Sequence, residues 1–350
     1  MLDAPHQAEE LDGEITVPVE AADAGTRLDR FLAERLGSMT RSQIQRAIRL
    51  DLVTVDGVVA CKTGLSVRAG QEVVIVPPPS LPTRALPQDI PLDVAYEDDQ
   101  VAVIRKPAGM VVHPAAGHPD GTLVNALLSR YPEMQRLDSL RPGVVHRLDR
   151  GTSGILVVAR TPLAREALSE QFLARTVTKG YVAVAAGSPK LDSGCIDQPI
   201  GRHRSDRKRF TSVDPLPPTR SATTLWRVAA RSSAPFSLLA IRILTGRTHQ
   251  IRVHLSAAGH PVAGDEIYGS GRLPPPLSCA AGGPQSGRPL LHAALLVFTH
   301  PSTGKRLAFH APLPPDMAAA VAHLFPAFSA DRLGCIEFFP DPGTSEGGGR

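Results

Sequence analysis

A run of prolines in the first quarter of the chain limits what the polypeptide can fold into more than any other feature. Prolines occupy positions 77, 78, 79, 82 and 87. Each proline fixes its own φ, removes a backbone donor and biases the preceding residue toward extended structure, so neither a helix nor a central strand can run through the segment. We therefore predict a semi-rigid linker over residues 80–90 with a domain on either side. A chain of 350 residues is long enough for two domains, each with its own core.

Charge is spread unevenly along the chain. Residues 1–23 hold seven acidic residues and no lysine or arginine; since the whole chain carries a net charge of +4, the remainder carries about +11. A body of that charge suits a polyanionic partner such as nucleic acid, although a basic surface without a partner is nearly as common. We expect residues 1–13 to form a flexible acidic tail and residues 326–350 a second tail.

Residues 14–79 show the pattern of a small domain with two helices and a hairpin. Four apolar residues at helical spacing between positions 28 and 36, followed by Gly37, predict a helix with Thr26 as its N-cap. A second helix is predicted from Thr40, whose spacing to Gln43 fits a capping box. Asp56-Gly57 lies between two valine-rich runs and predicts a β-hairpin, with residues 73–76 as a closing strand.

The polar side of the second predicted helix is basic. Arg41, Gln45 and Arg49 lie four residues apart and share one face. Solvated arginines on a small helical unit would explain this face as well as a binding surface would. Residues 24–77 nevertheless resemble the alpha-L type RNA-binding module, in which two short helices and a small sheet present a basic face to structured RNA. On that resemblance the candidate RNA contacts are Arg27, Arg41, Ser42, Gln45, Arg46 and Arg49.

Residues 91–325 form the second predicted domain. Apolar runs at 101–104, 155–159, 181–185 and 238–244 predict strands that alternate with only a few helices. This mixture indicates an α+β fold rather than a regular βαβ series.

The strongest local signal is GVVHRLDRGTSGILVVAR at 143–160, where two apolar runs bracket a polar loop that contains Asp149. Rigid strands often deliver reactive side chains on such loops. By itself, however, an arginine-rich loop with one aspartate is more often a salt-bridged turn than an active site.

The segment HRLDRGTSG resembles the catalytic loop of the RluA-type ribosomal pseudouridine synthase family. It occurs in order with segments that resemble the family's other landmarks: YEDDQVAVIRKPAGMVVHP at 96–114, KGYVAVAAG at 179–187, TGRTHQIRVHLSAAGHPVAGDEIYG at 245–269 and LLHAALLVFTHP at 290–301. The resemblance covers residues 91–315. It implies a mixed, mainly antiparallel sheet flanked by helices, an isomerase that needs no cofactor, and Asp149 as its essential carboxylate.

Three further residues take roles from the resemblance. Arg252 matches the arginine that pairs with the catalytic aspartate, and Tyr181 matches the tyrosine that stacks on the target uracil. Strand alternation also places Tyr181 on one face with two alanines, which leaves room for a guest ring. Arg147 matches the arginine that fills the space left by the flipped nucleotide. The alternatives are a helix-surface arginine for Arg252, a core tyrosine for Tyr181, and a phosphate-contacting or merely solvated loop arginine for Arg147.

A second basic segment, RHRSDRKR at 202–209, carries five lysines or arginines against one aspartate. We predict that it contacts the RNA backbone, and a solvated loop is the alternative. The residues concerned are Arg202, Arg204, Arg207, Lys208 and Arg209. No metal site is predicted, because the histidines are scattered and form no HExxH pattern.

The family resemblance favours a stem-loop of large-subunit ribosomal RNA as the substrate. Transfer RNA is the runner-up, and an inactive RNA-binding or ribosome assembly factor is the alternative from another class. The sequence departs from the family pattern at two places, Arg-Gly after HRLD and a Gly/Pro/Ser-rich stretch at 270–289. We expect these departures to affect which RNA is recognised rather than the reaction.

Cellular location follows from what the sequence lacks. The four cysteines lie far apart without a CxxC pair, and neither an export signal nor an 18-residue apolar run is present. We expect a cytoplasmic monomer without metal or membrane partners.

Overall fold

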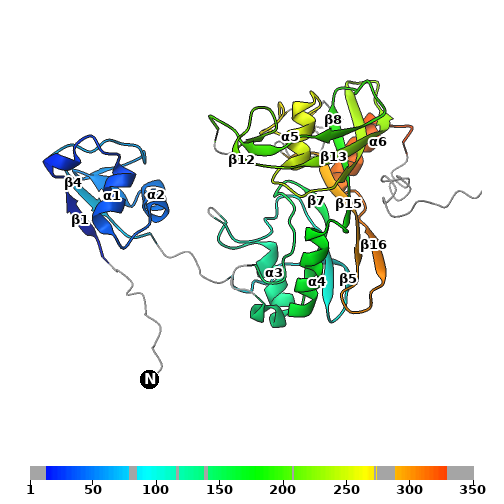
Figure 1. Cartoon of the computed structure of the whole chain (residues 1–350), viewed down its shortest axis with the longest axis horizontal. Helices are drawn as coiled ribbons and strands as arrows, with labels where there is room; N and C mark the ends of the chain where they lie inside the picture. The colour runs from blue at the N-terminus through cyan, green and yellow to red at the C-terminus, as the bar shows by residue number, and fades with distance from the viewer. Residues whose placement is uncertain are drawn as a thin grey trace, which may run out of the picture. The chain divides into compact units, whose positions relative to one another are not determined.

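The chain divides into two compact units, an N-terminal unit of residues 1–82 and a C-terminal unit of residues 83–350. The computed structural model describes residues 13–78, 85–115, 118–137, 141–206, 209–271, 273 and 288–328. The predicted tails fall almost entirely outside these ranges, as do most of the 270–289 stretch and the start of the predicted linker. Each unit is described by itself, and Figure 1 draws the N-terminal unit in blue.

The N-terminal unit packs two helices on a small antiparallel sheet. Its elements are β1 (Ile15–Pro18), a 3-10 helix η1 (Ala21–Asp23), α1 (Leu28–Leu36), α2 (Arg41–Arg49), β2 (Val53–Val55), β3 (Val58–Val59) and β4 (Glu72–Ile75). The strands lie in the order β1-β4-β2-β3. Leu28, Phe31 and Leu32 of α1 and Ile44 of α2 are buried in one cluster, as their helical spacing predicts.

The ends of these elements test the sequence predictions directly. The capping box of Thr40 and Gln43 is present at the start of α2, and Gly37 ends α1. Asp56 and Gly57 both have positive φ, 52° and 77°, as a tight hairpin turn requires. The prediction that Thr26 caps α1 is wrong. Arg27 is the N-cap, because its bridge to Ser66 keeps the chain extended for one residue longer.

The C-terminal unit is built on one large mixed sheet. Its strands are β5 (Asp93–Glu97), β6 (Val101–Lys106), β7 (Ser153–Ala159), β8 (Thr178–Ala186), β9 (Ser193–Asp197), β13 (Thr223–Arg231), β14 (Phe236–Ile243), β15 (Leu291–Thr299) and β16 (Arg306–His310). The order is β5-β6-β7-β15-β8-β14-β13-β9, with β16 against β15. All neighbours are antiparallel except β7 and β15, so the predicted mixed, mainly antiparallel α+β fold is confirmed.

Helices cover both faces of this sheet. They are α3 (Leu123–Arg130), a 3-10 helix η2 (Pro132–Arg136), α4 (Pro162–Leu173), α5 (Gln250–Ala257) and α6 (Pro315–Leu324). The face that carries Leu156 packs against α3 and α5, and the face that carries Val157 packs against α4. On β8, Tyr181 faces the α3 and α5 side, while Val182 faces α6. The predicted alternation on β8 is confirmed.

A smaller antiparallel sheet extends from the large one. It consists of β10 (Ile200–Arg202), β11 (Phe210–Thr211) and β12 (Leu216–Arg220), in the order β11-β10-β12. We call residues 200–220 the arm. Phe210 of the arm packs against the buried cluster that contains Val253 of α5, so the arm is attached to this helix.

Candidate active site

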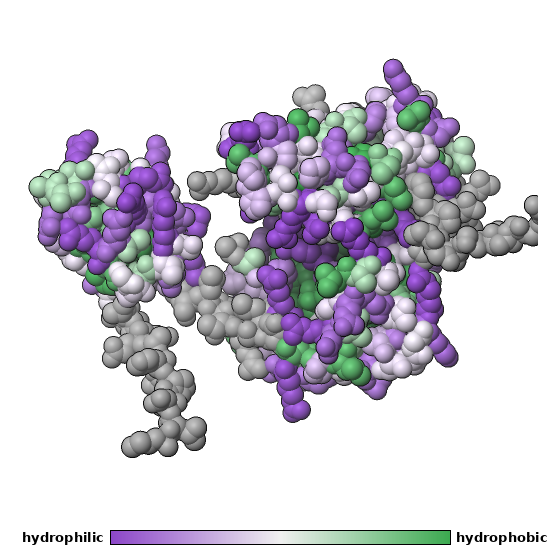
Figure 2. Space-filling model, in the orientation of Figure 1, coloured by the Kyte–Doolittle hydropathy of each residue, from purple (hydrophilic) through white to green (hydrophobic). Residues whose placement is uncertain are grey.

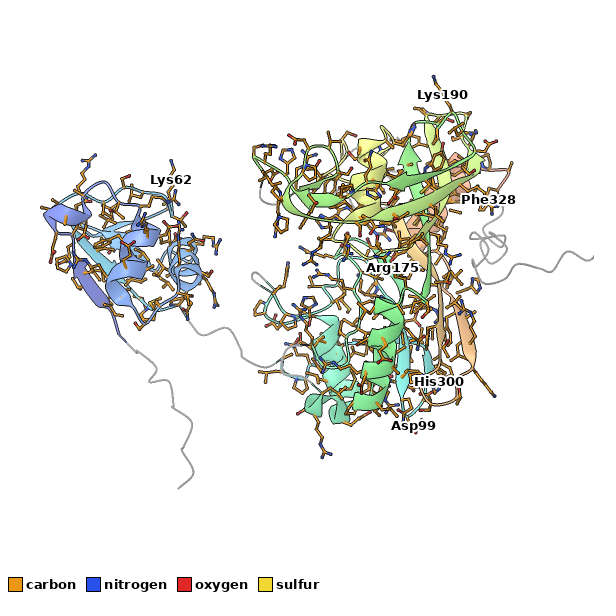
Figure 3. All side chains as sticks on the ribbon, in the orientation of Figure 1. Lys62, Asp99, Arg175, Lys190, His300 and Phe328 are labelled. Carbon is orange, nitrogen blue, oxygen red and sulfur yellow. The ribbon has the colours of Figure 1, made fainter. Side chains whose placement is uncertain are left out.

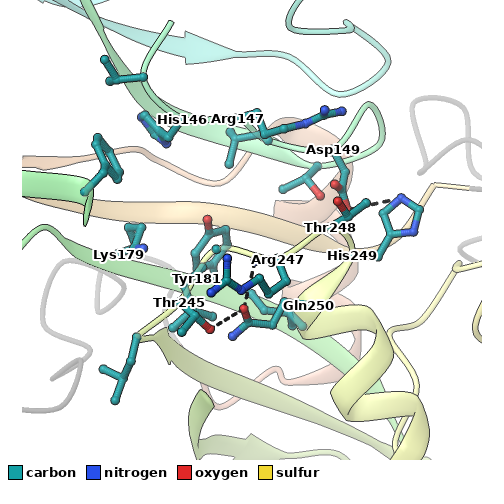
Figure 4. A pocket seen from close by; sticks show the side chains of 18 of the residues that line it. His146, Arg147, Asp149, Lys179, Tyr181, Thr245, Arg247, Thr248, His249 and Gln250 are labelled. Carbon is teal, nitrogen blue, oxygen red and sulfur yellow. Dashed lines mark hydrogen bonds and ion pairs between the residues drawn. The ribbon is translucent and has the colours of Figure 1, made fainter. Parts of the chain in front are cut away.

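A polar pocket opens on the face of the C-terminal unit that carries α5. Its volume is about 640 Å³. Three segments supply most of its lining: the loop of residues 144–152, the start of β8, and the segment from the end of β14 into α5. The end of α4 with Arg175, and Arg220 at the end of β12, also line it. Figure 2 shows the hollow with hydrophilic side chains gathered around it, and Figure 4 shows the residues inside.

Close backbone packing fixes the loop that carries Asp149. β7 touches β15 in parallel only at Ser153 and Gly154. Gly154 has a φ of 119°, and a Cβ there would lie 2.2 Å from the backbone oxygen of Ala293. Only glycine permits this approach. The strand that follows the loop is therefore anchored within five residues of Asp149.

A buried lysine fastens the loop from the other side. Lys106, at the end of β6, is 1% exposed, and its ammonium group donates hydrogen bonds to the carbonyl oxygens of Met110 (2.9 Å) and Arg150 (3.4 Å). The backbone N–H of Gly109 also donates to the carbonyl of Arg150, at 2.8 Å. The residue next to Asp149 is thus tied to the turn after β6, which limits how far Asp149 can move.

Asp149 faces a buried arginine held by a second aspartate. Nη1 of Arg252 lies 3.3 Å from Oδ2 of Asp149. The other edge of the same guanidinium donates to both oxygens of Asp265, at 2.6 and 2.9 Å. Arg252 and Asp265 are 6% and 0% exposed as side chains, whereas Asp149 is 18% exposed toward the pocket. Burial disfavours the guanidinium charge, but Asp265 and Asp149 together raise the pKa of Arg252.

Asp265 is itself fixed by the backbone. Its Oδ1 accepts hydrogen bonds from the N–H groups of Ile267 (3.0 Å) and Tyr268 (3.1 Å). The ring of Tyr268 also lies 5.0 Å from the guanidinium carbon of Arg252. Arg252 is therefore oriented by groups on three sides, and one pair of its donors is left to point at Asp149.

Tyr181 forms a floor of the pocket beside Asp149. It lies on β8 opposite Ala293 of β15 and is 7% exposed. Burial raises the pKa of Tyr181, and the charge of Asp149 raises it further, so the phenol stays protonated at neutral pH. The side chain therefore offers a neutral aromatic face.

A strained histidine stands on the far side of Asp149. His249 has a φ of 57°, which is uncommon outside glycine and concentrates at functional sites. Its Nδ1 is 2.8 Å from the hydroxyl of Tyr268, and its Nε2 is 4.0 Å from Oδ2 of Asp149. The N–H of Phe210 donates to the same hydroxyl, at 3.0 Å. Because burial lowers the pKa of His249, the imidazole facing Asp149 is neutral.

His146 supports the loop as a neutral ring. The backbone N–H of Val157 donates to Nε2 of His146 at 3.0 Å, and the ring stacks on Phe172 with centroids 4.5 Å apart. Burial, together with the charge of Lys179, lowers the pKa of His146 to about 3. The residue acts as an acceptor within the fold.

The structure gathers part of the predicted site and leaves part of it elsewhere. Asp149, Arg252, Tyr181 and Arg147 all line the pocket, with Arg147 projecting above Asp149 in Figure 4. In the basic segment of the arm, none of the described residues (202–206 and 209) lines it. There, Arg204 pairs with Asp214, while Arg202 and Arg209 lie over the rings of Phe210 and Tyr268. Arg207 and Lys208 lie outside the described residues.

In the N-terminal unit, half of the candidate contacts serve a buried carboxylate. Asp29 of α1 is fully buried and accepts hydrogen bonds from Arg27 (3.1 Å), Arg41 (3.0 Å) and Gln45 (2.6 Å). Although burial raises it, these donors lower the pKa of Asp29 to about 2. Both arginine side chains remain about half exposed. The remaining candidates are Ser42 and Arg49, which are exposed, and Arg46, which is half-buried.

Three residues of the site were not singled out from the sequence. Asp265, His249 and Lys106 all fall inside the landmark segments, but no spacing rule assigns them a contact. The turn GDEIYG carries Asp265 13 residues after Arg252, but nothing in the sequence signals that this carboxylate is buried against the arginine. The strain at His249 is visible only in three dimensions.

Two negative findings concern the described residues alone. No helix among them is both long and apolar enough to span a membrane. Within the same ranges, no three His, Cys, Asp or Glu side chains group in a way that could hold a metal ion.

Comparisons with known proteins agree with this geometry. Residues 100–257 match the family described as RNA pseudouridylate synthase, and residues 26–73 match the S4 domain. Ribosomal large subunit pseudouridine synthase D of Vibrio parahaemolyticus is 42% identical over 308 residues, 87% of this chain and 93% of its own. An uncharacterized RNA pseudouridine synthase of Chloroflexus aurantiacus is 45% identical over 311 residues, 89% of this chain and 94% of its own.

A solved structure shares the fold. Human RNA pseudouridylate synthase domain containing 1 aligns with a TM-score of 0.52 and 28% identity, over 70% of this chain and 90% of that one.

Proposed function

Because the chain belongs to the RNA pseudouridine synthase family, we propose that it isomerises uridines in a stem-loop of large-subunit ribosomal RNA, with Asp149 as its catalytic carboxylate. The observation that carries the assignment of Asp149 is its contact with a buried arginine at the edge of a polar pocket. The proposed substrate rests on relatives that are named as large-subunit ribosomal enzymes.

The reaction explains why such a carboxylate is needed. The N1–C1′ bond of uridine must break, the uracil must turn while bound, and C5 must bond to C1′ in place of N1. A carboxylate promotes the cleavage either by attacking C1′ or by removing a proton from the sugar. Both routes require an ionised Asp149 that touches the ribose.

Arg252 keeps that charge available. An unpaired carboxylate inside a pocket that excludes water would be costly, and a cation within hydrogen-bond distance offsets the cost. Asp265 takes the other edge of Arg252, so the arginine cannot swing away to solvent when RNA enters. The role of Asp265 is to position Arg252.

Tyr181 and Arg147 complete the proposed catalytic arrangement. Enzymes that modify a base in RNA take it out of the stack and hold it in a pocket by stacking and edge contacts. The protonated ring of Tyr181 supplies the stacking surface. Arg147, exposed on the loop, fills the space that the base leaves, since a guanidinium both stacks and binds phosphate.

The N-terminal unit holds the RNA. It matches the S4 domain, and exposed Ser42 and Arg49 lie on α2 beside the arginines that hold Asp29. Backbone contacts of this kind position the substrate without reading its sequence. A ribosomal RNA substrate places the enzyme in the cytoplasm. Transfer RNA remains the second candidate substrate.

Two measurements test whether large-subunit ribosomal RNA is the substrate. The purified protein should release tritium from [5-³H]uridine-labelled large-subunit ribosomal RNA, because C5 loses its hydrogen when it bonds to C1′. Mapping of pseudouridines in cells with and without the protein should reveal missing sites in that RNA. If neither ribosomal nor transfer RNA releases tritium, the chain is an inactive RNA-binding factor and the proposal fails.

A further inference from the structure

The pocket contains a group of cations that the chemistry at Asp149 does not use. Arg175 after α4, Lys179 at the start of β8, Arg220 at the end of β12 and Arg247 before α5 all line it. In Figure 4, Asp149 and His249 lie at one end of the view and Lys179 at the other, with Tyr181 and Arg247 between them. We call Arg175, Lys179, Arg220 and Arg247 the cation cluster.

No described carboxylate pairs with a member of the cation cluster. The charges that shift the pKa of Lys179 are those of Arg175 and Arg247, and the charges that shift the pKa of Arg247 are those of Arg220 and Arg175. Burial, together with the charges of Arg175 and Arg247, lowers the pKa of Lys179 to about 8. Like charges brought together inside a pocket destabilise one another, so the arrangement favours a bound anion.

The cluster is held in place by the fold. Lys179 lies on the same face of β8 as Tyr181 and is 9% exposed, with its ammonium 5.7 Å from the ring centre of Phe172. Nε of Arg247 donates to the carbonyl of Ser221 at 3.0 Å. The backbone N–H of Arg247 donates to Gln250, which also accepts from Thr245. The two inner cations are therefore set in position before any ligand arrives.

Exposure changes along the cluster. Lys179 is buried and Arg247 half-buried, while Arg175 and Arg220 are exposed at the mouth. Figure 3 shows Arg175 near the middle of the C-terminal unit. A cationic path that runs from solvent to the floor of the pocket matches a strand of RNA that enters beside its flipped-out base.

We propose that the cation cluster binds a backbone phosphate next to the flipped uridine, with Lys179 and Arg247 as its inner ligands and Arg175 and Arg220 along the approaching strand. This inference rests on the proposed function, because it places the phosphate of the substrate RNA relative to Tyr181. A guanidinium and an ammonium both suit phosphate oxygens, and each such charged contact is worth about tenfold or more in affinity.

The experiment removes the negative charge of one linkage at a time. The probe is a stem-loop of large-subunit ribosomal RNA in which the wild-type protein forms pseudouridine. Four linkages are tested, two on the 5′ side of the uridine and two on its 3′ side, each in a separate RNA. In each RNA the linkage is replaced by a neutral methylphosphonate next to a 2′-deoxy sugar, and the RNA with the same deoxy sugar and an ordinary phosphate is the reference. Affinity and single-turnover rate are measured for wild type, Lys179→Met, Arg175→Gln and Lys190→Gln.

The expected result is loss of additivity at one linkage. There, the methylphosphonate weakens binding to wild type about tenfold or more, and Lys179→Met weakens binding of the unmodified RNA by a similar factor. In Lys179→Met the methylphosphonate then costs less than twofold, because its partner is gone. Lys190 is exposed at the far end of the unit in Figure 3, so Lys190→Gln should keep wild-type affinity and full sensitivity to the methylphosphonate.

Two results would overturn the inference. One is that, at all four linkages, the methylphosphonate weakens RNA binding by Lys179→Met and by Arg175→Gln by the same factor as it weakens binding by the wild type. The other is a lower rate at saturating RNA with affinity and sensitivity unchanged, which would mean that the cations act on the detached uracil. Arg175→Gln guards against misfolding, because Arg175 is exposed. If the wild type forms no pseudouridine in any ribosomal stem-loop, the proposed function has failed, and that outcome is separate from both.

Discussion

Asp265→Asn isolates the positioning of Arg252 from the chemistry of Asp149. The substitution keeps the shape of the side chain and the acceptor that serves the backbone N–H groups of Ile267 and Tyr268. It replaces the other oxygen by an amide whose N–H groups face the donors of Arg252. The site then loses one charge of a fully buried pair, at contacts of 2.6 and 2.9 Å.

The cost follows from burial. Removing one partner of a buried ion pair costs about 3–5 kcal/mol, since the other charge is left uncompensated. Asp149 still compensates Arg252 in part, through its contact at 3.3 Å, so the lower end of that range applies. We expect the free energy of unfolding to fall by about 3 kcal/mol. Loss of orientation should lower the single-turnover rate about 10- to 100-fold while RNA affinity stays within twofold.

The assay uses a natural probe. The chain has one tryptophan, Trp226 in β13, so urea unfolding followed by its fluorescence reports on the C-terminal unit alone. Asp93→Asn is the matched control, because Asp93 pairs with Arg105 at the surface and is 62% exposed; its loss should cost less than about 1 kcal/mol. An Asp265→Asn protein with wild-type stability and rate would refute the reasoning. A loss of RNA affinity without a change in rate would refute it as well.

Three further predictions concern stability and RNA binding. Burial is the main cause that lowers the pKa of His146 to about 3 and that of His292 to about 4. Below about pH 6.5 these two imidazoles therefore bind protons in the unfolded state but stay neutral in the native state. Urea unfolding should therefore show each histidine's contribution falling by about 2 kcal/mol between pH 7 and 5; flat stability would contradict this. Gly154→Ala should lower the melting temperature by several degrees, because the added Cβ would lie 2.2 Å from the backbone oxygen of Ala293. An unchanged melting temperature would show that β7 and β15 do not pack this closely. Deleting residues 1–80 should weaken RNA binding and flatten its dependence on salt, and an unchanged slope would count against the basic face of α2.

Local patterns predicted local structure well. Helical spacing and the Thr40 capping box placed α1 and α2, and the alternation of tyrosine, alanine and valine placed Tyr181 on the correct face of β8. These features depend on neighbours within a few residues. The error at Thr26 came from a long-range bridge, since Arg27 pairs with Ser66, which no local rule foresees.

The site itself depended on more than pattern. An aspartate in an arginine-rich loop reads as a salt-bridged turn, and only the family resemblance marked Asp149. The structure adds that its partner Arg252 comes from a helix 103 residues later and that Asp265 holds this partner. Such contacts have no signature in sequence spacing. The same holds for Asp29, whose burial turns Arg27 and Arg41 into structural as well as candidate RNA-binding residues.

The central claim is that the charge of Asp149 performs the chemistry. Asn has the same shape as Asp without the negative charge, and Asp149 is only 18% exposed and in contact with Arg252, so its carboxylate offers little surface for docking the RNA. The decisive measurement is tritium release from C5-labelled ribosomal RNA by Asp149→Asn, with RNA affinity measured in parallel. We predict no release and an affinity within a few fold of wild type. Release at the wild-type rate would contradict the claim.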